Sequence, residues 1–320
     1  MRERWERHQL AVYLGGLGIG VAVGVLTPTL GRPLEHVVTP LLAVLLYATF
    51  LQVPLERPVA ALGQGRFLPT LLAVNFVAAP LVVAALLGLA RLDGTGPADA
   101  VVVGLLLTLL TPCIDYVVVF TGVAGGDRER LLACTPILLG LQALLLPGYL
   151  WLLGPGPDPG SLVSPGPFVT ALVALLLLPL GAALLPRRAG PRPAARRLRA
   201  GADAAMVPLL ALVLLAVAAS QVPRLDGRLD EVAAAVPLLV GFTAAMLVVG
   251  LLAARLTGLA VPEARALVLS GITRNSLVVL PLALTLPPEL DLAPAVVVTQ
   301  TLVELVVLLG LVRALPRWVA

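Results

Sequence analysis

Ten long apolar runs dominate the sequence and restrict the chain to a membrane-embedded helical fold. Each run is about 20 residues long, the length that an α-helix needs to cross the hydrocarbon core of a bilayer. The runs are continuous and rich in Leu and Ala rather than alternating, so they predict helices and disfavour a β-barrel. The predicted spans cover approximately residues 10–28, 37–54, 67–90, 100–122, 131–153, 167–186, 204–221, 232–254, 266–286 and 293–312.

The composition excludes the main alternatives to a membrane protein. The chain is 59% hydrophobic and 12% charged, whereas soluble domains have about 25% charged residues. Two Cys and two His give no disulfide framework, zinc module or catalytic triad. Because phosphate loops, dinucleotide fingerprints and metalloprotease motifs are also missing from the sequence, we expect a transporter rather than an enzyme, without a cofactor and not itself driven by ATP.

The distribution of arginine predicts the orientation in the membrane. All 22 basic residues are Arg, and a cytoplasmic N-terminus places 17 of them inside and 4 outside, with one left within a span. The positive-inside rule therefore predicts that both termini are cytoplasmic. The basic loop 187–199 is interpreted as a topology signal that contacts anionic lipid, and not as a nucleic-acid site.

The spans also predict an internal repeat. Spans 1–5 and spans 6–10 form two sets of five, and an odd number of spans per set makes the two sets face opposite sides of the bilayer. Residues 1–186 hold the first repeat together with span 6, residues 187–203 are the basic loop, and residues 204–320 complete the second repeat. We expect a single transport unit, with the fourth and ninth helices broken and crossing at the midplane.

The predicted fourth span contains TPCIDY, residues 111–116. Pro112 cannot donate a backbone hydrogen bond, so the helix is expected to break there. A break in hydrocarbon requires burial or a watery cavity, and Thr111, Asp115 and Tyr116 offer local partners. The alternative is a proline kink with no role in transport.

The predicted ninth span contains SGITRNS, residues 270–276. Gly271 is expected to allow a break, and the polar cluster includes Thr273, Arg274, Asn275 and Ser276. A cluster of this polarity in a membrane helix is hard to explain by packing alone. Half-helix ends at such a break can present partial charges to a solute.

Arg274 is expected to need a buried acid partner, because an unpaired guanidinium in a membrane is costly. Asp115 is the first candidate and Glu304 the second. An Asp115–Arg274 pair can be a static salt bridge or a coupling site in which a proton or substrate competes for the carboxylate, and the sequence leaves both interpretations open.

Three further polar residues are secondary candidates. Gln300 and Glu304 in the tenth span are four residues apart and share one helical face, which fits either a functional site or an interhelical hydrogen-bond patch. Asn75 precedes Pro80 in the third span, where it either satisfies a kink or lines a cavity.

Cys113, in the fourth span, belongs to the main candidates for the substrate site. It is either inert packing or a soft ligand for a thiophilic metalloid such as trivalent arsenic.

These residues resemble those of the bile acid:sodium symporter superfamily, and within it the arsenite efflux permeases known as bacterial arsenic resistance proteins. The most specific element is the Pro-Cys of TPCIDY, since arsenite permeases similarly carry a Pro-Cys in the fourth span. NFVAAP, residues 75–80, is similar to an Asn-aromatic pair in their third span. The resemblance implies a core of crossed broken helices, a panel of other helices, and a bacterial inner-membrane location.

The ninth span departs from the sodium-coupled members of the superfamily. The resemblance implies that those members bind cations near the crossing with hydroxyls, amides and a ninth-helix Glu, whereas this segment contains Arg274. A fixed guanidinium can take the electrostatic place of sodium, which favours proton coupling or uniport.

The sequence therefore supports two main functional hypotheses. The first is proton-coupled efflux of arsenite or a related metalloid oxyanion, in which Cys113 contacts the solute and Asp115 exchanges a proton. The alternative is a sodium- or proton-coupled carrier of an organic anion anchored by Arg274. A third hypothesis is a membrane scaffold or sensor that does not transport a solute. The expected partners are the small solute and the lipid bilayer, and homo-oligomerisation stays open.

Overall fold

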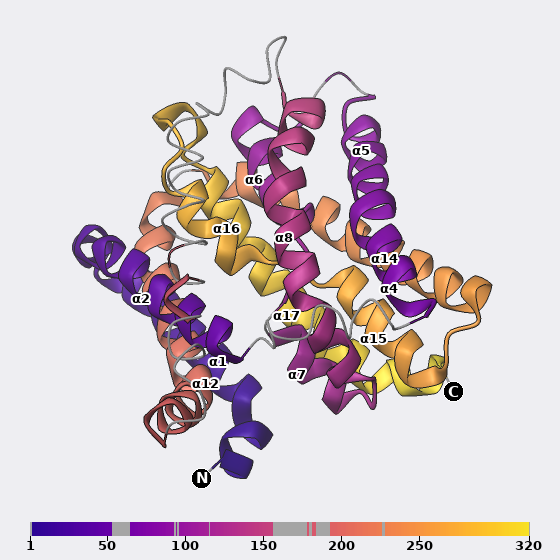
Figure 1. The fold of residues 1–320 in the computed structure, drawn as a ribbon. Helices are drawn as coiled ribbons and strands as arrows, with labels where there is room; N and C mark the ends of the chain where they lie inside the picture. The colour runs from indigo at the N-terminus through magenta and orange to yellow at the C-terminus, as the bar shows by residue number, and fades with distance from the viewer. Residues whose placement is uncertain are drawn as a thin grey trace. The chain divides into compact units, whose positions relative to one another are not determined.

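The described part of the chain is helical. The computed structural model describes residues 2–52, 65–92, 94, 96–114, 116–155, 178, 181–183, 193–225 and 228–319 (Figure 1). Within these ranges, the β-type pairing consists of one isolated antiparallel bridge, between Pro112 and Arg274. The chain divides into two compact units, each of which combines residues from both halves of the sequence: Met1–Gln52 with Pro165–Leu229, and Val53–Ser164 with Asp230–Ala320.

The first unit is built on close helix packing at glycine. Its main helices are α1 (Arg2–Leu26), α2 (Gly31–Gln52) and α12 (Pro193–Gln221), and α12 packs against both others. Gly16, Gly20 and Gly24 lie four residues apart on α1, and a Cβ at each would lie within 3 Å of an atom of α12 or of the turn that follows it. Small residues at this spacing let the backbones of membrane helices approach closely.

The second unit contains most of the described helices. The third span is continuous from residue 67 to residue 89, with a five-residue π-helical segment in the middle, and two later segments are split into short helices. The elements are α4 (Phe67–Ala73), η2 (Val74–Ala78), α5 (Ala79–Leu89), α6 (Asp99–Leu109), α7 (Tyr116–Val123), α8 (Arg128–Leu153), α13 (Leu229–Ala233), α14 (Ala235–Thr257), α15 (Val261–Ile272), α16 (Ser276–Ala283), η5 (Pro288–Leu290) and α17 (Ala293–Trp318).

Four helical segments of this unit are long and apolar enough to cross a membrane. They are Phe67–Leu89, Arg128–Leu153, Leu229–Thr257 and Pro288–Leu308, and they agree with the predicted third, fifth, eighth and tenth spans. Most of the predicted sixth span, 167–186, lies outside the described residues. The structure thus supports a multi-pass membrane protein, while the number of ten spans stays a prediction.

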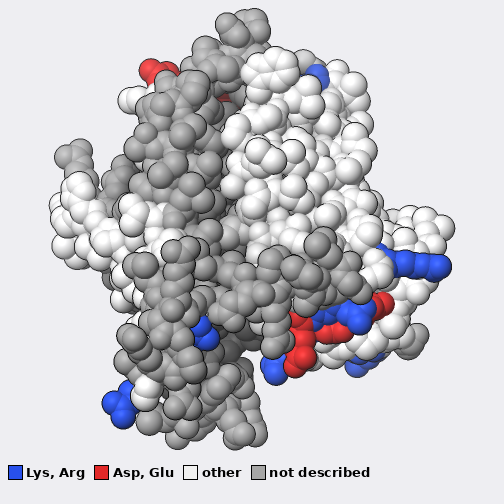
Figure 2. All heavy atoms as spheres, in the orientation of Figure 1, with Lys and Arg blue, Asp and Glu red and all other residues white. Residues whose placement is uncertain are grey.

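The surface of the second unit fits a lipid environment. Leu81, Leu144, Trp151, Val248 and Val306 are all more than half exposed. Figure 2 shows a broad expanse without blue or red atoms on this unit, with charged side chains gathered mainly near one end. Exposed apolar side chains over long helices are costly in water and favourable in hydrocarbon.

Candidate functional site

The helix of the predicted fourth span is broken around Pro112. α6 ends at Leu109 and α7 begins at Tyr116, and Pro112 supplies no N–H to continue the helix. The hydroxyl of Thr111 donates to the carbonyls of Leu107 and Thr108, both at 3.0 Å. The Thr108 carbonyl also accepts the N–H of Thr111 at 3.4 Å, so the hydroxyl of Thr111 helps to satisfy the last carbonyl groups of this helix.

The helix of the predicted ninth span is broken at residues 273–275. Thr273 ends α15 in an extended conformation, and its hydroxyl donates to the Leu269 carbonyl at 2.8 Å. Asn275 precedes α16, and its side-chain oxygen accepts the Val278 N–H at 3.4 Å. The prediction placed the break at Gly271, but α15 continues past this residue to Ile272.

The two broken segments pair with each other through their backbones. The N–H of Cys113 donates to the Thr273 carbonyl at 3.3 Å, and the N–H of Asn275 donates to the Thr111 carbonyl at 2.8 Å. Together these bonds make the antiparallel bridge between Pro112 and Arg274. In hydrocarbon an unwound backbone must find partners within the protein, and here each break supplies the partners of the other.

Arg274 lies fully buried at this crossing. One terminal nitrogen of its guanidinium donates to the Gly271 carbonyl, and the group lies 5.0 Å from the ring centre of Phe242 on α14. The other two nitrogens, Nε and Nη1, have no hydrogen-bond partner among the described residues. A buried guanidinium with two such nitrogens carries a large desolvation cost, although the aromatic ring stabilises part of its charge.

The acid partner expected for the guanidinium is not found in the described part of the chain. Asp115, the first candidate, lies outside the described residues. Glu304, the second candidate, accepts the backbone N–H of Arg274 at 2.7 Å instead of pairing with its side chain. Glu304 thus lies at the crossing, but it contacts the peptide group of the residue that it was expected to neutralise.

Glu304 connects three segments of the second unit. Its carboxylate also accepts the Tyr116 hydroxyl at 2.6 Å and the Gln300 side-chain amide at 2.5 Å. Tyr116 begins α7, Arg274 lies between α15 and α16, and Gln300 and Glu304 lie on α17. Three donors to one buried carboxylate stabilise its charged form, because hydrogen bonds to charged groups are the strong ones.

Other predicted polar residues tie neighbouring helices to the broken ones. The amide of Asn75, in the π-helical segment η2, donates to the Ser270 hydroxyl on α15 at 3.2 Å and to the carbonyl of Leu71 at 3.0 Å. The hydroxyls of Ser276 on α16 and Thr301 on α17 lie 2.6 Å apart. These contacts hold the third and tenth spans against the broken ninth.

Cys113 lies at the crossing and is fully buried. Cys134 on α8 is also buried. Within the described ranges, no group of three His, Cys, Asp or Glu residues is placed to hold a metal ion. In the part of the chain that the structure describes, Cys113 is therefore a soft ligand that belongs to no cluster of three ionisable ligands.

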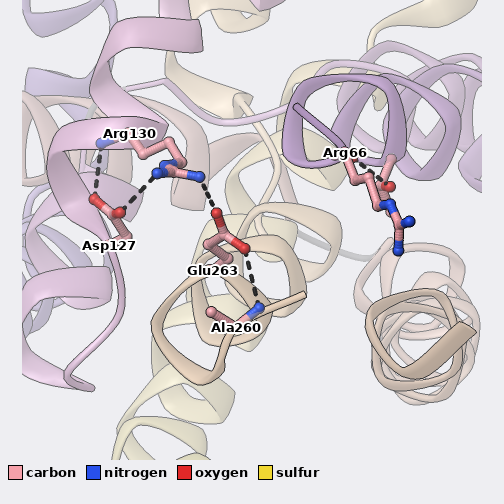
Figure 3. A network of polar contacts seen from close by, with 6 residues as sticks. Arg66, Asp127, Arg130, Ala260 and Glu263 are labelled. Carbon is pink, nitrogen blue, oxygen red and sulfur yellow. Dashed lines mark hydrogen bonds and ion pairs between the residues drawn. The ribbon is translucent and has the colours of Figure 1, made fainter. Parts of the chain in front are cut away.

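A charged network at one end of the second unit was missed by the sequence analysis. Arg130 contacts Glu263 and lies 3.4 Å from Asp127, while Glu263 also accepts the Ala260 N–H at 3.0 Å (Figure 3). Arg66 donates to the carbonyl of Thr257 at 3.2 Å. The available signal was local, since Asp127 and Glu263 stand where acidic residues stabilise helix starts.

This network also fixes the outer ends of the two broken helices. The N–H of Asp127, just after α7, donates to the Pro262 carbonyl in the first turn of α15 at 2.9 Å. Arg265 on α15 donates to the carbonyls of Ala124 and Val319 at 3.3 and 3.0 Å. α7 and α15 are thereby joined at this end as well as at the crossing.

Comparison with known proteins identifies the family of the chain. The profile of the sodium bile acid symporter family matches residues 39–224, which is more than half of the sequence and includes the first broken helix. Comparison with curated proteins finds no match. Members of this family are transporters, in agreement with the apolar helices and the buried polar crossing. The chain belongs to the sodium bile acid symporter family.

Proposed function

We propose that the chain is a secondary transporter that carries a small organic anion, with Arg274 as its anchor and without a bound sodium ion. The observation that carries this proposal is the burial of Arg274 at the crossing, with Nε and Nη1 unpartnered among the described residues. The planar guanidinium can donate two parallel hydrogen bonds to the oxygen atoms of an anionic group such as a carboxylate or a sulfonate, and charge-assisted hydrogen bonds are about twice as strong as neutral ones.

The positive charge of Arg274 also bears on coupling. The family resemblance implies that sodium-coupled relatives bind their cation near this crossing. A sodium ion and the Arg274 guanidinium in one low-dielectric site would repel each other strongly. Since Arg remains charged at all physiological pH values, a sodium ion is not needed to make the crossing attractive to an anion. The proposal therefore couples transport to protons or to the solute gradient alone.

The proposed architecture is ten helices in two inverted repeats of five. Residues 1–186 hold the first repeat and span 6, residues 187–203 form the basic loop, and residues 204–320 hold the remaining spans of the second repeat. This architecture is supported by the broken helices in the predicted fourth and ninth spans, the corresponding positions of the two repeats. The excess of arginine on one side supports cytoplasmic termini in a bacterial inner membrane.

A second candidate function is efflux of arsenite, favoured by the position of Cys113 at the crossing. A thiol is a suitable ligand for trivalent arsenic. The two candidates differ in the residue that contacts the solute, Cys113 or Arg274. The arsenite mechanism is contradicted if Cys113→Ser and Asp115→Asn both leave arsenite extrusion from everted vesicles unchanged.

The organic-anion proposal is tested by uptake into liposomes that contain the purified protein. Labelled taurocholate serves as the probe, because the family description names bile acids, and choline replaces sodium in a parallel series. We expect saturable uptake in both media. Arg274→Gln should lower uptake at limiting taurocholate by roughly 10- to 100-fold, since a lost hydrogen bond to a charged group costs about 1.5–3 kcal/mol.

Arg255→Gln is the matched control, because Arg255 is exposed in the last turn of α14. It should leave uptake unchanged. Uptake that collapses in choline medium would contradict the replacement of sodium by Arg274. Equal uptake by Arg274→Gln and Arg255→Gln would contradict the role of Arg274 as the anchor.

A further inference from the structure

The hydroxyl of Tyr116 lies within hydrogen-bond distance of both Glu304 and the backbone of Arg274. It is 2.6 Å from Oε1 of Glu304 and 3.1 Å from the carbonyl oxygen of Arg274. A phenol has one proton to donate and can also accept a hydrogen bond. Tyr116 can therefore donate to Glu304 or, after rotation of its O–H bond, donate to Arg274 and accept from Glu304.

From this geometry we infer that Glu304 is the proton-binding carboxylate of the transporter and that Tyr116 switches its hydrogen bond when the proton arrives. A hydronium ion transfers its proton to Oε1 of Glu304, which becomes neutral, and a water molecule remains. That O–H donates to the oxygen of Tyr116, while the Tyr116 hydroxyl turns to the Arg274 carbonyl. Release of the proton reverses these steps, and Tyr116 keeps its own proton throughout.

The arrangement is suited to this exchange because protonation leaves no strong donor without a partner. The carboxylate accepts Tyr116 at Oε1, whereas Arg274 N–H and Gln300 bind Oε2. Protonation at Oε1 leaves both bonds at Oε2 in place, although an uncharged acceptor weakens them. The free-energy cost of changing the protonation state of a buried polar network is small only if every donor keeps a hydrogen-bond acceptor in both states.

Few ionisable side chains lie on the described helices that pack against the helix of Glu304. α17 packs against α6, α7, α14 and α16. Their ionisable side chains are Asp99 in the first turn of α6, Tyr116 at the start of α7 and Arg255 in the last turn of α14, while α16 carries none. On α17 itself, the basic residues lie more than two turns away, at Arg313 and Arg317.

Among the described residues, the groups that donate hydrogen bonds to Glu304 are Tyr116, Gln300 and the backbone of Arg274. Within the described ranges, the guanidinium of Arg274 is a positive charge that interacts with the Glu304 carboxylate, and the Cys113 thiol lies beside Arg274 at the crossing. Protonation of Glu304 removes one negative charge beside Arg274 and weakens the bond to its N–H. The charge state of Glu304 is thereby linked to the segment that carries the proposed anion anchor.

This inference rests on the proposed transport function, so its first test does not use transport. Infrared difference spectra between acidic and alkaline buffer are recorded on the full chain in lipid nanodiscs. We expect a pH-dependent carboxyl band that Glu304→Gln removes. Tyr116→Phe should retain the band but shift its frequency, because the protonated carboxyl loses its hydrogen-bond acceptor.

Two variants serve as controls for this spectrum. Glu289→Gln removes an exposed carboxylate near the start of α17 and should leave the band in place. Asp115→Asn tests the other carboxylate that the sequence places near the crossing. A band that survives in Glu304→Gln, or that is lost in Asp115→Asn instead, overturns the inference, and so does a Tyr116→Phe spectrum identical to that of the native chain.

A transport measurement extends the test. Taurocholate uptake driven by a pH gradient should be lost in Glu304→Gln and retained in Glu289→Gln. Retained pH-driven uptake in Glu304→Gln overturns the proton site while the proposed function stands. If the native chain takes up no taurocholate but shows the band assigned to Glu304, the proposed substrate is wrong and the proton site remains supported.

Discussion

Substitution of Glu304 by alanine tests the hydrogen-bond network at the crossing through protein stability. Glu304 is 3% exposed and accepts three hydrogen bonds, from Tyr116, Gln300 and the backbone of Arg274. Alanine removes the acceptor for all three. Tyr116 keeps the Arg274 carbonyl as an alternative acceptor, so two buried donors lose their only acceptor identified in the described residues.

The expected loss of stability follows from the number of bonds. Hydrogen bonds between membrane helices are worth about 0.6 kcal/mol on average, so the two bonds that Glu304 accepts from other segments, from Tyr116 and the backbone of Arg274, give a lower value of about 1 kcal/mol. A buried donor left without a partner costs about 1–3 kcal/mol, so two such donors give an upper value of about 6 kcal/mol. We therefore expect Glu304→Ala to lower the free energy of unfolding by about 1–6 kcal/mol.

Unfolding in mixed micelles with increasing dodecyl sulfate, followed by circular dichroism, measures this difference. Glu289→Ala is the matched control, because Glu289 is exposed and surface substitutions usually change the free energy of unfolding by no more than about 0.5 kcal/mol. Equal stability of Glu304→Ala and Glu289→Ala would refute the argument that Glu304 joins α7, the break after α15, and α17.

Two further predictions concern contacts of α17. A Cβ at Gly104 would lie 2.7 Å from Val296 Cβ on α17, so Gly104→Ala should destabilise the protein by about 1–3 kcal/mol in a thermal unfolding assay. The control is Gly310→Ala, which should be neutral or stabilising because a Cβ at Gly310 would meet no neighbouring atom within 4 Å. A double-mutant cycle of Ser276→Ala and Thr301→Val should give a coupling energy of about 0.6 kcal/mol in the same assay, and a value of zero would contradict their hydroxyl contact.

Much of the local structure could be predicted from the sequence. Pro112 marked the first break because its missing N–H removes a helical hydrogen bond, whatever the surrounding tertiary structure is. The polar residues from Thr273 to Ser276 marked the second break to within two residues. The glycine stripe on α1 was also present in the sequence, but its partner helix, α12, is almost 200 positions away and has no corresponding local signal.

The pairing of charges was predicted less well. The sequence suggested that Arg274 is neutralised by a buried acid, and Glu304 does lie beside it, yet Glu304 binds the backbone N–H of Arg274 and the hydroxyl of Tyr116. A charge count names the residues that need partners. It does not specify which atoms of those residues meet, because a peptide group freed by a helix break competes for the same carboxylate.

The sequence by itself determined that the chain is a helical membrane protein with buried polar residues at two interrupted segments, because hydropathy and the missing N–H of proline are local properties. Only the tertiary structure decided that the two interruptions satisfy each other's backbone groups. It also decided that Tyr116 reaches a carbonyl 158 positions away. Such contacts depend on how helices cross, and the crossing is set by packing over the whole unit rather than by any short stretch of sequence.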